Sequence, residues 1–146
     1  MTPEEKTLLL KDLCARLPYG VKVNDDIQGD FTLIGLTTER ILTTCEVEGC
    51  HNDFPIENIK PYLFPLSSMS DEMVEELNAN VFFKYRDTFA NVSHLISNGK
   101  ITEEIYTYID IESISYLIEL FHKHHIDYNG LIEKGLALDA TGLNVY

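Results

Sequence analysis

The spacing of the apolar residues changes from helical to alternating near residue 20, and this change limits which folds the N-terminal half can adopt. Leu9, Leu13 and Leu17 recur at helical spacing, which predicts a helix with one apolar face. Thr2 and Glu5 are placed to form a capping box at its start. Pro18 and Gly20 then end the helix.

Residues 21–64 have the pattern of short strands joined by tight turns. Val21 and Val23 alternate with polar residues, as do Phe31 and Leu33, and a third β-branched strand is predicted from Ile41 to Val47. Asn, Asp and Gly residues between these runs favour turns. Strands this short predict a small antiparallel SH3-like β-barrel or meander, capped by the first helix. The two prolines in residues 60–65 argue against a central strand there.

The C-terminal half is expected to contain helices and one hairpin. Acidic residues at 71 and 72 suit the first turn of a helix over about residues 71–78. Residues 79–91 fit neither helical nor strand spacing, whereas Asn98-Gly99 predicts a type I′ hairpin turn within residues 97–100. Ile114, Ile118 and Phe121 mark a last helix that ends near residue 124.

The predicted fold class is therefore α+β: an N-terminal helix, the barrel or meander, then a hairpin and C-terminal helices. We expect a single domain over residues 1–146, with the helix and barrel-like part in residues 1–66 and an α+β part in residues 67–146.

The charge of the chain bears on its partners. Its 146 residues include 24 acidic and 11 basic side chains, which gives a net charge of −13. A negative field spread along the chain disfavours direct binding to nucleic acid, so we expect a protein partner, with a basic one favoured. No apolar run is long enough to span a bilayer. The acidic N-terminus lacks the features of a signal peptide, and three cysteines suit a reducing compartment, so we expect a cytoplasmic protein without membrane contact.

One group of residues suggests a metal site. Cys45, Cys50 and His51, together with His122 and His125, offer ligand types that zinc accepts. The spacing matches structural zinc sites poorly, and Cys45 can equally pack as a small hydrophobic residue. The histidines also suit the negative end of a helix without any further role. Both interpretations stay open, and we predict no cofactor.

The residue pattern does not point to an enzyme. It contains neither a Gly-x-Ser-x-Gly elbow nor a Walker phosphate loop, and its acidic pairs are adjacent, so their side chains point apart. We therefore predict no catalytic residue. Tyr62, Tyr128, Asn129 and Leu131 are candidate binding residues, because they combine polar groups and apolar anchors near turns. The alternative is that Tyr128 and Leu131 only pin the C-terminal segment to the core.

Three segments of the chain carry a resemblance to a known family. These are residues 12–21 (DLCARLPYGV), 59–70 (IKPYLFPLSSMS) and 125–138 (HIDYNGLIEKGLAL). Together they resemble a family of small uncharacterised proteins from intestinal anaerobic bacteria, often encoded in phage-like or mobile regions. The chain departs from the family pattern at Asn129, where Arg is common, and in lacking Trp in the last helix. The resemblance implies an intracellular protein of mobile-element origin, and it supplies no activity, cofactor or catalytic residue to carry over.

These observations favour a small acidic protein that acts as a non-catalytic interaction or regulatory module. The alternative is a metal- or small-ligand-binding protein that uses the cysteine and histidine clusters.

Overall fold

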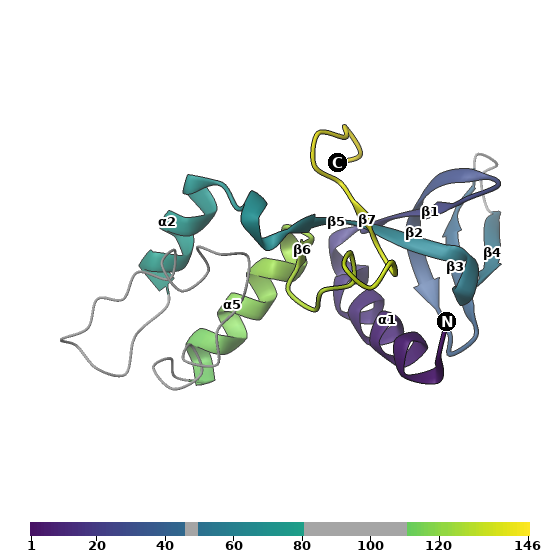
Figure 1. The fold of residues 1–146 in the computed structure, drawn as a ribbon, viewed down its shortest axis with the longest axis horizontal. Helices are drawn as coiled ribbons and strands as arrows, with labels where there is room; N and C mark the ends of the chain where they lie inside the picture. Colours follow the sequence, from purple (N-terminus) through teal and green to yellow (C-terminus); the bar gives the residue numbers. More distant parts are fainter. Residues whose placement is uncertain (46–49, 81–110) are drawn as a thin grey trace. The chain divides into compact units, whose positions relative to one another are not determined.

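The computed structural model describes residues 1–45, 50–80 and 111–146, which fall into two compact units (Figure 1). Unit 1 comprises Met1–Leu63 and Asn129–Tyr146, and unit 2 comprises Phe64–Tyr128. Unit 1 thus includes the C-terminal residues that the sequence analysis grouped with the second half. The single domain over residues 1–146 stays a prediction. The expected hairpin at residues 97–100 and most of the ambiguous stretch over 79–91 lie outside the described residues.

Unit 1 begins with the predicted helix, α1 (Pro3–Arg16). The capping box is confirmed, since Thr2 Oγ1 accepts from the Glu5 N–H at 3.2 Å and Glu5 Oε2 accepts from the Thr2 N–H at 2.7 Å. A 3₁₀ turn, η1 (Leu17–Tyr19), follows, and Gly20 closes it with a φ of 68°. Glycine adopts this left-handed conformation without steric cost.

The sheet of unit 1 is mixed and open. Four strands, β1 (Lys22–Asp25), β2 (Gly29–Leu36), β3 (Arg40–Thr44) and β4 (His51–Pro55), form an antiparallel meander in chain order. On its other side β1 pairs antiparallel with β5 (Ile59–Pro65), which follows the 3₁₀ turn η2 (Ile56–Asn58). β7 (Leu138–Asp139) then pairs parallel with β5. The α+β class and the meander are therefore confirmed, but the described strands do not close into a barrel.

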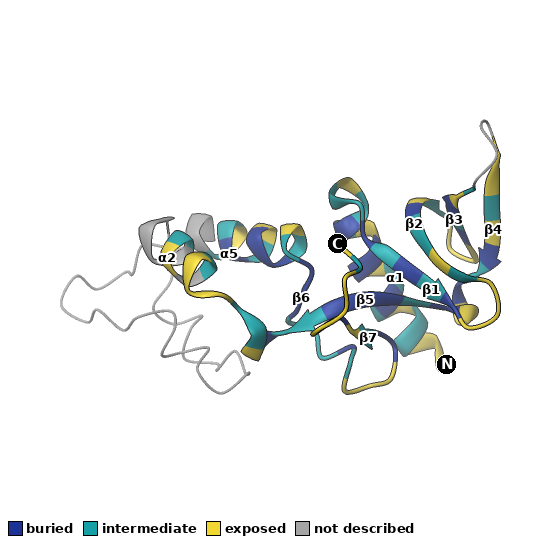
Figure 2. Cartoon of the chain, turned by 90° about the horizontal axis from the view of Figure 1, so that it is seen from above, coloured by how far each residue is buried: buried dark blue, intermediate teal, exposed yellow. Residues whose placement is uncertain are grey.

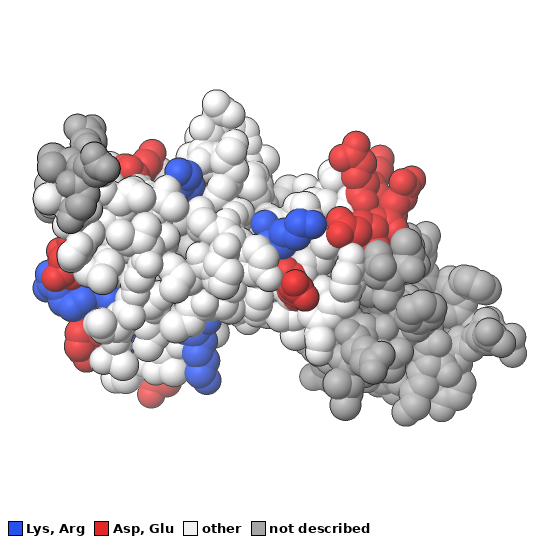
Figure 3. Space-filling view, turned by 180° about the vertical axis from the view of Figure 1, so that it is seen from behind, with Lys and Arg blue, Asp and Glu red and all other residues white. Residues whose placement is uncertain are grey.

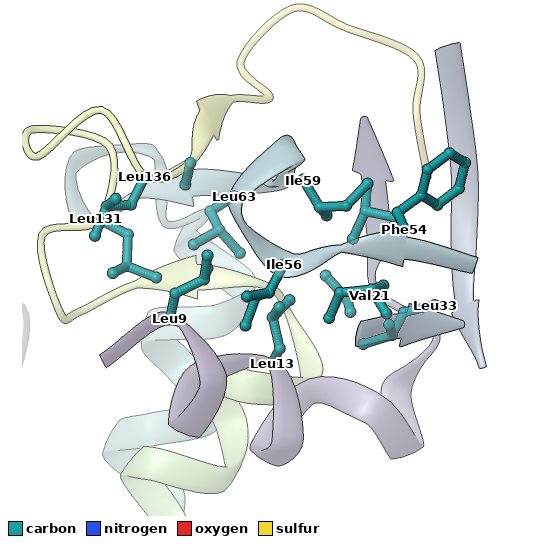
Figure 4. Packing of buried hydrophobic residues seen from close by; sticks show 13 residues of the cluster. Leu9, Leu13, Val21, Leu33, Phe54, Ile56, Ile59, Leu63, Leu131 and Leu136 are labelled. Atoms are coloured by element: carbon teal, nitrogen blue, oxygen red, sulfur yellow. The ribbon is translucent and has the colours of Figure 1, made fainter. Parts of the chain in front are cut away.

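One face of the meander and one face of α1 enclose the core of unit 1 (Figure 4). Buried positions alternate with less buried ones along the strands (Figure 2). The buried Val23, Leu33 and Ile41 belong to one cluster with Leu9 and Leu13 of the helix. The C-terminal residues Leu131, Leu136 and Ala137 belong to the same cluster. Side chains at the intervening strand positions therefore form an outer face, away from α1.

The prediction that prolines exclude a central strand over residues 60–65 is wrong. β5 has β1 on one side and β7 on the other. The carbonyl of Tyr62 accepts a bond on the β1 side, and that of Leu63 accepts from the Ala140 N–H on the β7 side. Because backbone groups alternate along a strand, the nitrogen of Pro61 lies on the β7 side. Pairing with β7 begins only at Tyr62, so the N–H that proline lacks is not needed there. Pro65 is the last residue of the strand.

The described residues of unit 2 form two helices and a short strand pair. The 3₁₀ turn η3 (Leu66–Ser68) leads to α2 (Asp71–Asn80), whose first turn is capped by a bond of 3.3 Å from the Met73 N–H to Ser70 Oγ. Helix α5 (Ile111–Lys123) precedes β6 (Ile126–Asp127), which pairs parallel with the last two residues of β5. Within the described part of unit 2, the buried core residues are Leu66, Leu117, Leu120, Phe121 and Ile126. Among the described residues, no helix is long and apolar enough to cross a membrane.

Candidate functional site

The outer face of the meander carries a row of polar side chains. Lys22 of β1 lies opposite Thr32 of β2, and its Nζ donates a hydrogen bond of 2.6 Å to Thr32 Oγ1. The N–H of Thr32 donates in turn to Thr44 Oγ1 on β3, at 3.2 Å. Lys22 is half-buried and has no acidic partner within ion-pair distance among the residues that the structure describes. Its ammonium is thus a cation that hydroxyl groups hold in place and no carboxylate neutralises directly.

A carboxylate lies one row further along the same face. Asp30 Oδ1 accepts hydrogen bonds from Asn24 Nδ2 at 2.7 Å and from the Tyr62 hydroxyl at 2.8 Å. Tyr62 is buried despite its place on the outer face. Burial, and secondarily the neighbouring Asp30, raise the pKa of Tyr62, so the phenol remains a donor at neutral pH. These bonds fix the Asp30 carboxylate near Lys22.

The two charged side chains line a pocket of about 270 Å³. Its other walls come from Phe31, Thr32 and Thr44, and from Asn144 and Val145 of the C-terminal segment. Pockets for whole drug-sized ligands or cofactors usually measure about 300–1,000 Å³. This smaller space, with a cation, a carboxylate and hydroxyls around it, suits one or two polar side chains of a peptide.

The C-terminal segment is joined to the sheet through Tyr146. Its hydroxyl accepts a bond of 3.2 Å from the Lys22 N–H and donates one of 2.7 Å to the Tyr62 carbonyl. Tyr146 keeps 45% of its surface exposed, but desolvation around its hydroxyl raises the pKa to about 12, against the opposing effects of the Lys22 N–H and of Arg16. The hydroxyl is therefore protonated and bridges β1 and β5. The segment rises from the sheet on the side away from α1 (Figure 1).

The predicted metal ligands fall in both units. Cys45 follows β3 and is half-buried, while Cys50 and His51 are exposed at the start of β4. In unit 2, His122 Nε2 lies 2.8 Å from the Tyr128 hydroxyl, and His125 is buried just beyond α5. Within the described ranges, no group of three or more His, Cys, Asp or Glu side chains is placed to hold a metal ion. The metal site stays a prediction.

The predicted binding residues are not gathered in one place. Tyr62 borders the pocket through its bond to Asp30. Tyr128 lies in unit 2, where it stacks on Phe121 with ring centroids 5.6 Å apart. Asn129 Nδ2 donates a bond of 3.0 Å to Asp12 Oδ1, and Leu131 is fully buried in the core of unit 1. The last three thus have packing roles, and a binding role for them stays a prediction.

The sequence analysis did not select Lys22, Asp30, Thr32, Thr44 or Tyr146. The alternation in residues 21–33 does place Lys22 and Thr32 on the polar side of their strands. It cannot show that a C-terminal segment forms a wall beside them, because that contact joins residues more than a hundred positions apart.

Comparison of the chain with protein-family models, with curated proteins and with solved structures found no match.

Proposed function

We propose that unit 1 is a non-catalytic protein-interaction module, which binds an extended segment of a partner protein in the pocket between Lys22 and Asp30. The observation that carries this proposal is that the chain's own residues 144–146 already lie against this face. The Tyr146 hydroxyl bonds there to one backbone group of β1 and one of β5, which supports binding of an extended segment at this face. The proposal includes a likeness of unit 1 to SH3-like modules, because both the helix α1 and the antiparallel meander suit such a fold.

Charge supports a partner with exposed basic residues. The net charge of −13 favours encounter with a cationic protein, mainly by raising the association rate. Asp71 and Glu72 contribute an acidic patch at the start of α2, whereas unit 1 shows charges of both signs (Figure 3). Within the pocket, the Asp30 carboxylate can accept from a basic side chain, while Lys22 can donate to backbone carbonyls. We place this interaction in the cytoplasm of a host cell that carries a mobile element.

The test is affinity capture from a lysate of the bacterium that encodes the chain, with three versions of the bait. Lys22→Glu reverses the charge in the pocket, and Lys11→Glu makes the same change on exposed α1. We expect at least one protein to be captured by the wild type and by Lys11→Glu. Its recovery with Lys22→Glu should fall about tenfold, because a glutamate cannot donate to the partner's backbone carbonyls and leaves them unpaired at the interface.

Quantitative mass spectrometry of the captured fractions gives the readout. Identical recovery with all three baits would show that the pocket is not the interaction surface. Recovery should also fall as salt is raised to about 0.5 M, because the long-range attraction is screened.

A further inference from the structure

The tyrosine hydroxyl occupies a position that a backbone bond would otherwise fill. β1 and β5 pair at Val23–Pro61 and Asn24–Lys60, and the same register would place Lys22 opposite Tyr62. At that point the Lys22 N–H and the Tyr62 carbonyl both bond to the hydroxyl of Tyr146 instead of to each other. We call this gap between the two backbone groups the tyrosine slot.

Only a group that both accepts and donates a hydrogen bond can pair with the two backbone groups of the tyrosine slot. A phenol hydroxyl does so, and the rise in its pKa keeps it protonated. A phenylalanine seated there would keep the Lys22 N–H and the Tyr62 carbonyl apart without bonding to either of them, and two unpaired backbone groups cost free energy to the extent that they are shielded from water. The slot therefore distinguishes tyrosine from phenylalanine.

Most of the segment that fills the slot is exposed. Thr141, Gly142, Leu143 and Asn144 are exposed, Val145 is half-buried, and Tyr146 keeps 45% of its surface exposed. At its start, the Thr141 N–H donates to Asp139 Oδ1 and the Leu143 N–H donates to the Ala140 carbonyl. At residue 146, the tyrosine hydroxyl bonds to the sheet. Segments with few buried contacts open at low free-energy cost while the rest of the protein remains folded. The tyrosine can thus leave the slot without unfolding the core.

We propose that residues 141–146 are an intramolecular occupant of a binding site for tyrosine-bearing segments. The partner is an extended protein segment whose tyrosine enters the tyrosine slot and whose preceding residues line the pocket beside Lys22 and Thr32, as Asn144 and Val145 do here. This inference rests on the proposed function and specifies its ligand and its regulation. While the chain's own tyrosine occupies the slot, a partner must displace it.

The direct test uses the full chain and two short peptides. One peptide has the sequence of residues 141–146 (TGLNVY), with an acetylated start and an amidated end so that no terminal charge contributes. The matched control replaces its tyrosine by phenylalanine. Binding to the wild type and to Tyr146→Phe is measured by fluorescence anisotropy of the labelled peptides. NMR spectra of both proteins show that each is folded.

We expect the tyrosine peptide to bind Tyr146→Phe about tenfold more tightly than the wild type, because the variant's tail competes less well for the slot. The phenylalanine peptide should bind Tyr146→Phe about tenfold more weakly than the tyrosine peptide. If Tyr146→Phe fails to fold, Val145→Ser, which weakens the seating of the same segment, should also bind the tyrosine peptide more tightly than the wild type.

Three results would overturn the inference. Equal binding of the two peptides would show that the hydroxyl is not recognised. Absence of binding by the folded variants would show that the slot serves only its own tail. A wild-type dimer that Tyr146→Phe abolishes would show exchange of residues 141–146 between two copies. If neither peptide binds but Lys22→Glu still captures less of a partner than the wild type does, the proposed function stands and only the specificity for tyrosine is excluded.

Discussion

At the scale of single residues, the largest fully buried side chain of unit 1 is a charged one. Arg16 donates from Nε to Asp12 Oδ2 at 2.6 Å and from Nη2 to Asp12 Oδ1 at 3.0 Å. Asn129 adds a third bond to the same carboxylate. The pair thus connects α1 to the turn where the chain re-enters unit 1. Removal of one partner of a buried ion pair is costly, because the other charge stays buried without compensation. Replacement of both partners by apolar residues is often tolerated.

Replacement of Asp12 by alanine should therefore be strongly destabilising. We expect Asp12→Ala to lower the free energy of unfolding by about 3–5 kcal/mol, because the guanidinium stays buried after its carboxylate is lost. Urea unfolding followed by circular dichroism measures the change. The double variant Asp12→Leu/Arg16→Met should recover most of the loss. A change below about 0.5 kcal/mol in Asp12→Ala would show that the pair is unimportant.

Tyr146 should titrate later than an ordinary tyrosine. Its folded pKa is raised to about 12, so the folded state holds this proton more tightly than the unfolded state does. Its contribution to stability is therefore full below the unfolded pKa of about 10 and is lost as the pH rises through about 12. Ultraviolet difference spectra of the native protein should show a late phenolate step. Because the pKa of Tyr62 is also raised, the late step should not vanish in Tyr146→Phe but should lose the amplitude of one tyrosine. An unchanged amplitude would contradict the assignment.

At the scale of elements, prediction from sequence succeeded where local chemistry decides the structure. The start of α1 depends on Thr2 and Glu5. The first two strands depend on the alternation of apolar and polar residues on either side of their turn. It failed at β5, where proline propensity argued against a central strand. The outcome there depends on where β7 begins, and β7 is distant in the sequence. β4, with three polar residues among its five, has no strand pattern of its own and forms by pairing with β3.

The capping box gives a prediction for α1. We expect Thr2→Ala to lower the free energy of unfolding by about 1 kcal/mol, because the Glu5 N–H loses its acceptor. Thr7→Ala is the matched control, since Thr7 is exposed and bonds only to the Pro3 carbonyl within the helix. Urea unfolding of both variants makes the comparison. Equal effects would mean that the cap contributes no more than an ordinary surface threonine.

In unit 2 the end of α5 should make stability depend on pH. Burial lowers the pKa of His124, Lys123 lowers it further, and Glu76, whose Oε2 is 3.9 Å away, opposes this only in part. The folded state therefore prefers the neutral ring. The stability that this provides is present above the unfolded pKa of about 6.5 and is lost as the pH falls through the folded value. Hydrogen exchange in α5 should accelerate more between about pH 7.5 and 5 in the wild type than in His124→Gln. Parallel acceleration in the two proteins would exclude His124 as the cause.

At the scale of the whole molecule, the candidate site depends on the return of the chain to its starting unit. Lys22, Thr32 and Thr44 were recognisable as an outward-facing set only from their strand alternation, which every surface strand shows. The pocket becomes a site because residues 144–146 lie beside that set. Contacts between segments so far apart leave no periodic signal in a single sequence. The fold class was thus accessible from local patterns, while the site was not.

The division into two units leads to the last prediction. Leu131 follows unit 2 in the chain, yet it is fully buried in the core of unit 1. Leu131→Ala should lower the free energy of unfolding by about 3 kcal/mol, because apolar burial is lost and a cavity is left behind. If the units open separately, hydrogen exchange should accelerate in α1 and β1 but not in α5. Leu117→Ala, in the core of unit 2, should give the opposite pattern. Acceleration throughout both units in either variant would instead reveal one cooperative domain over residues 1–146, because the loss at one core would then be shared by the whole chain.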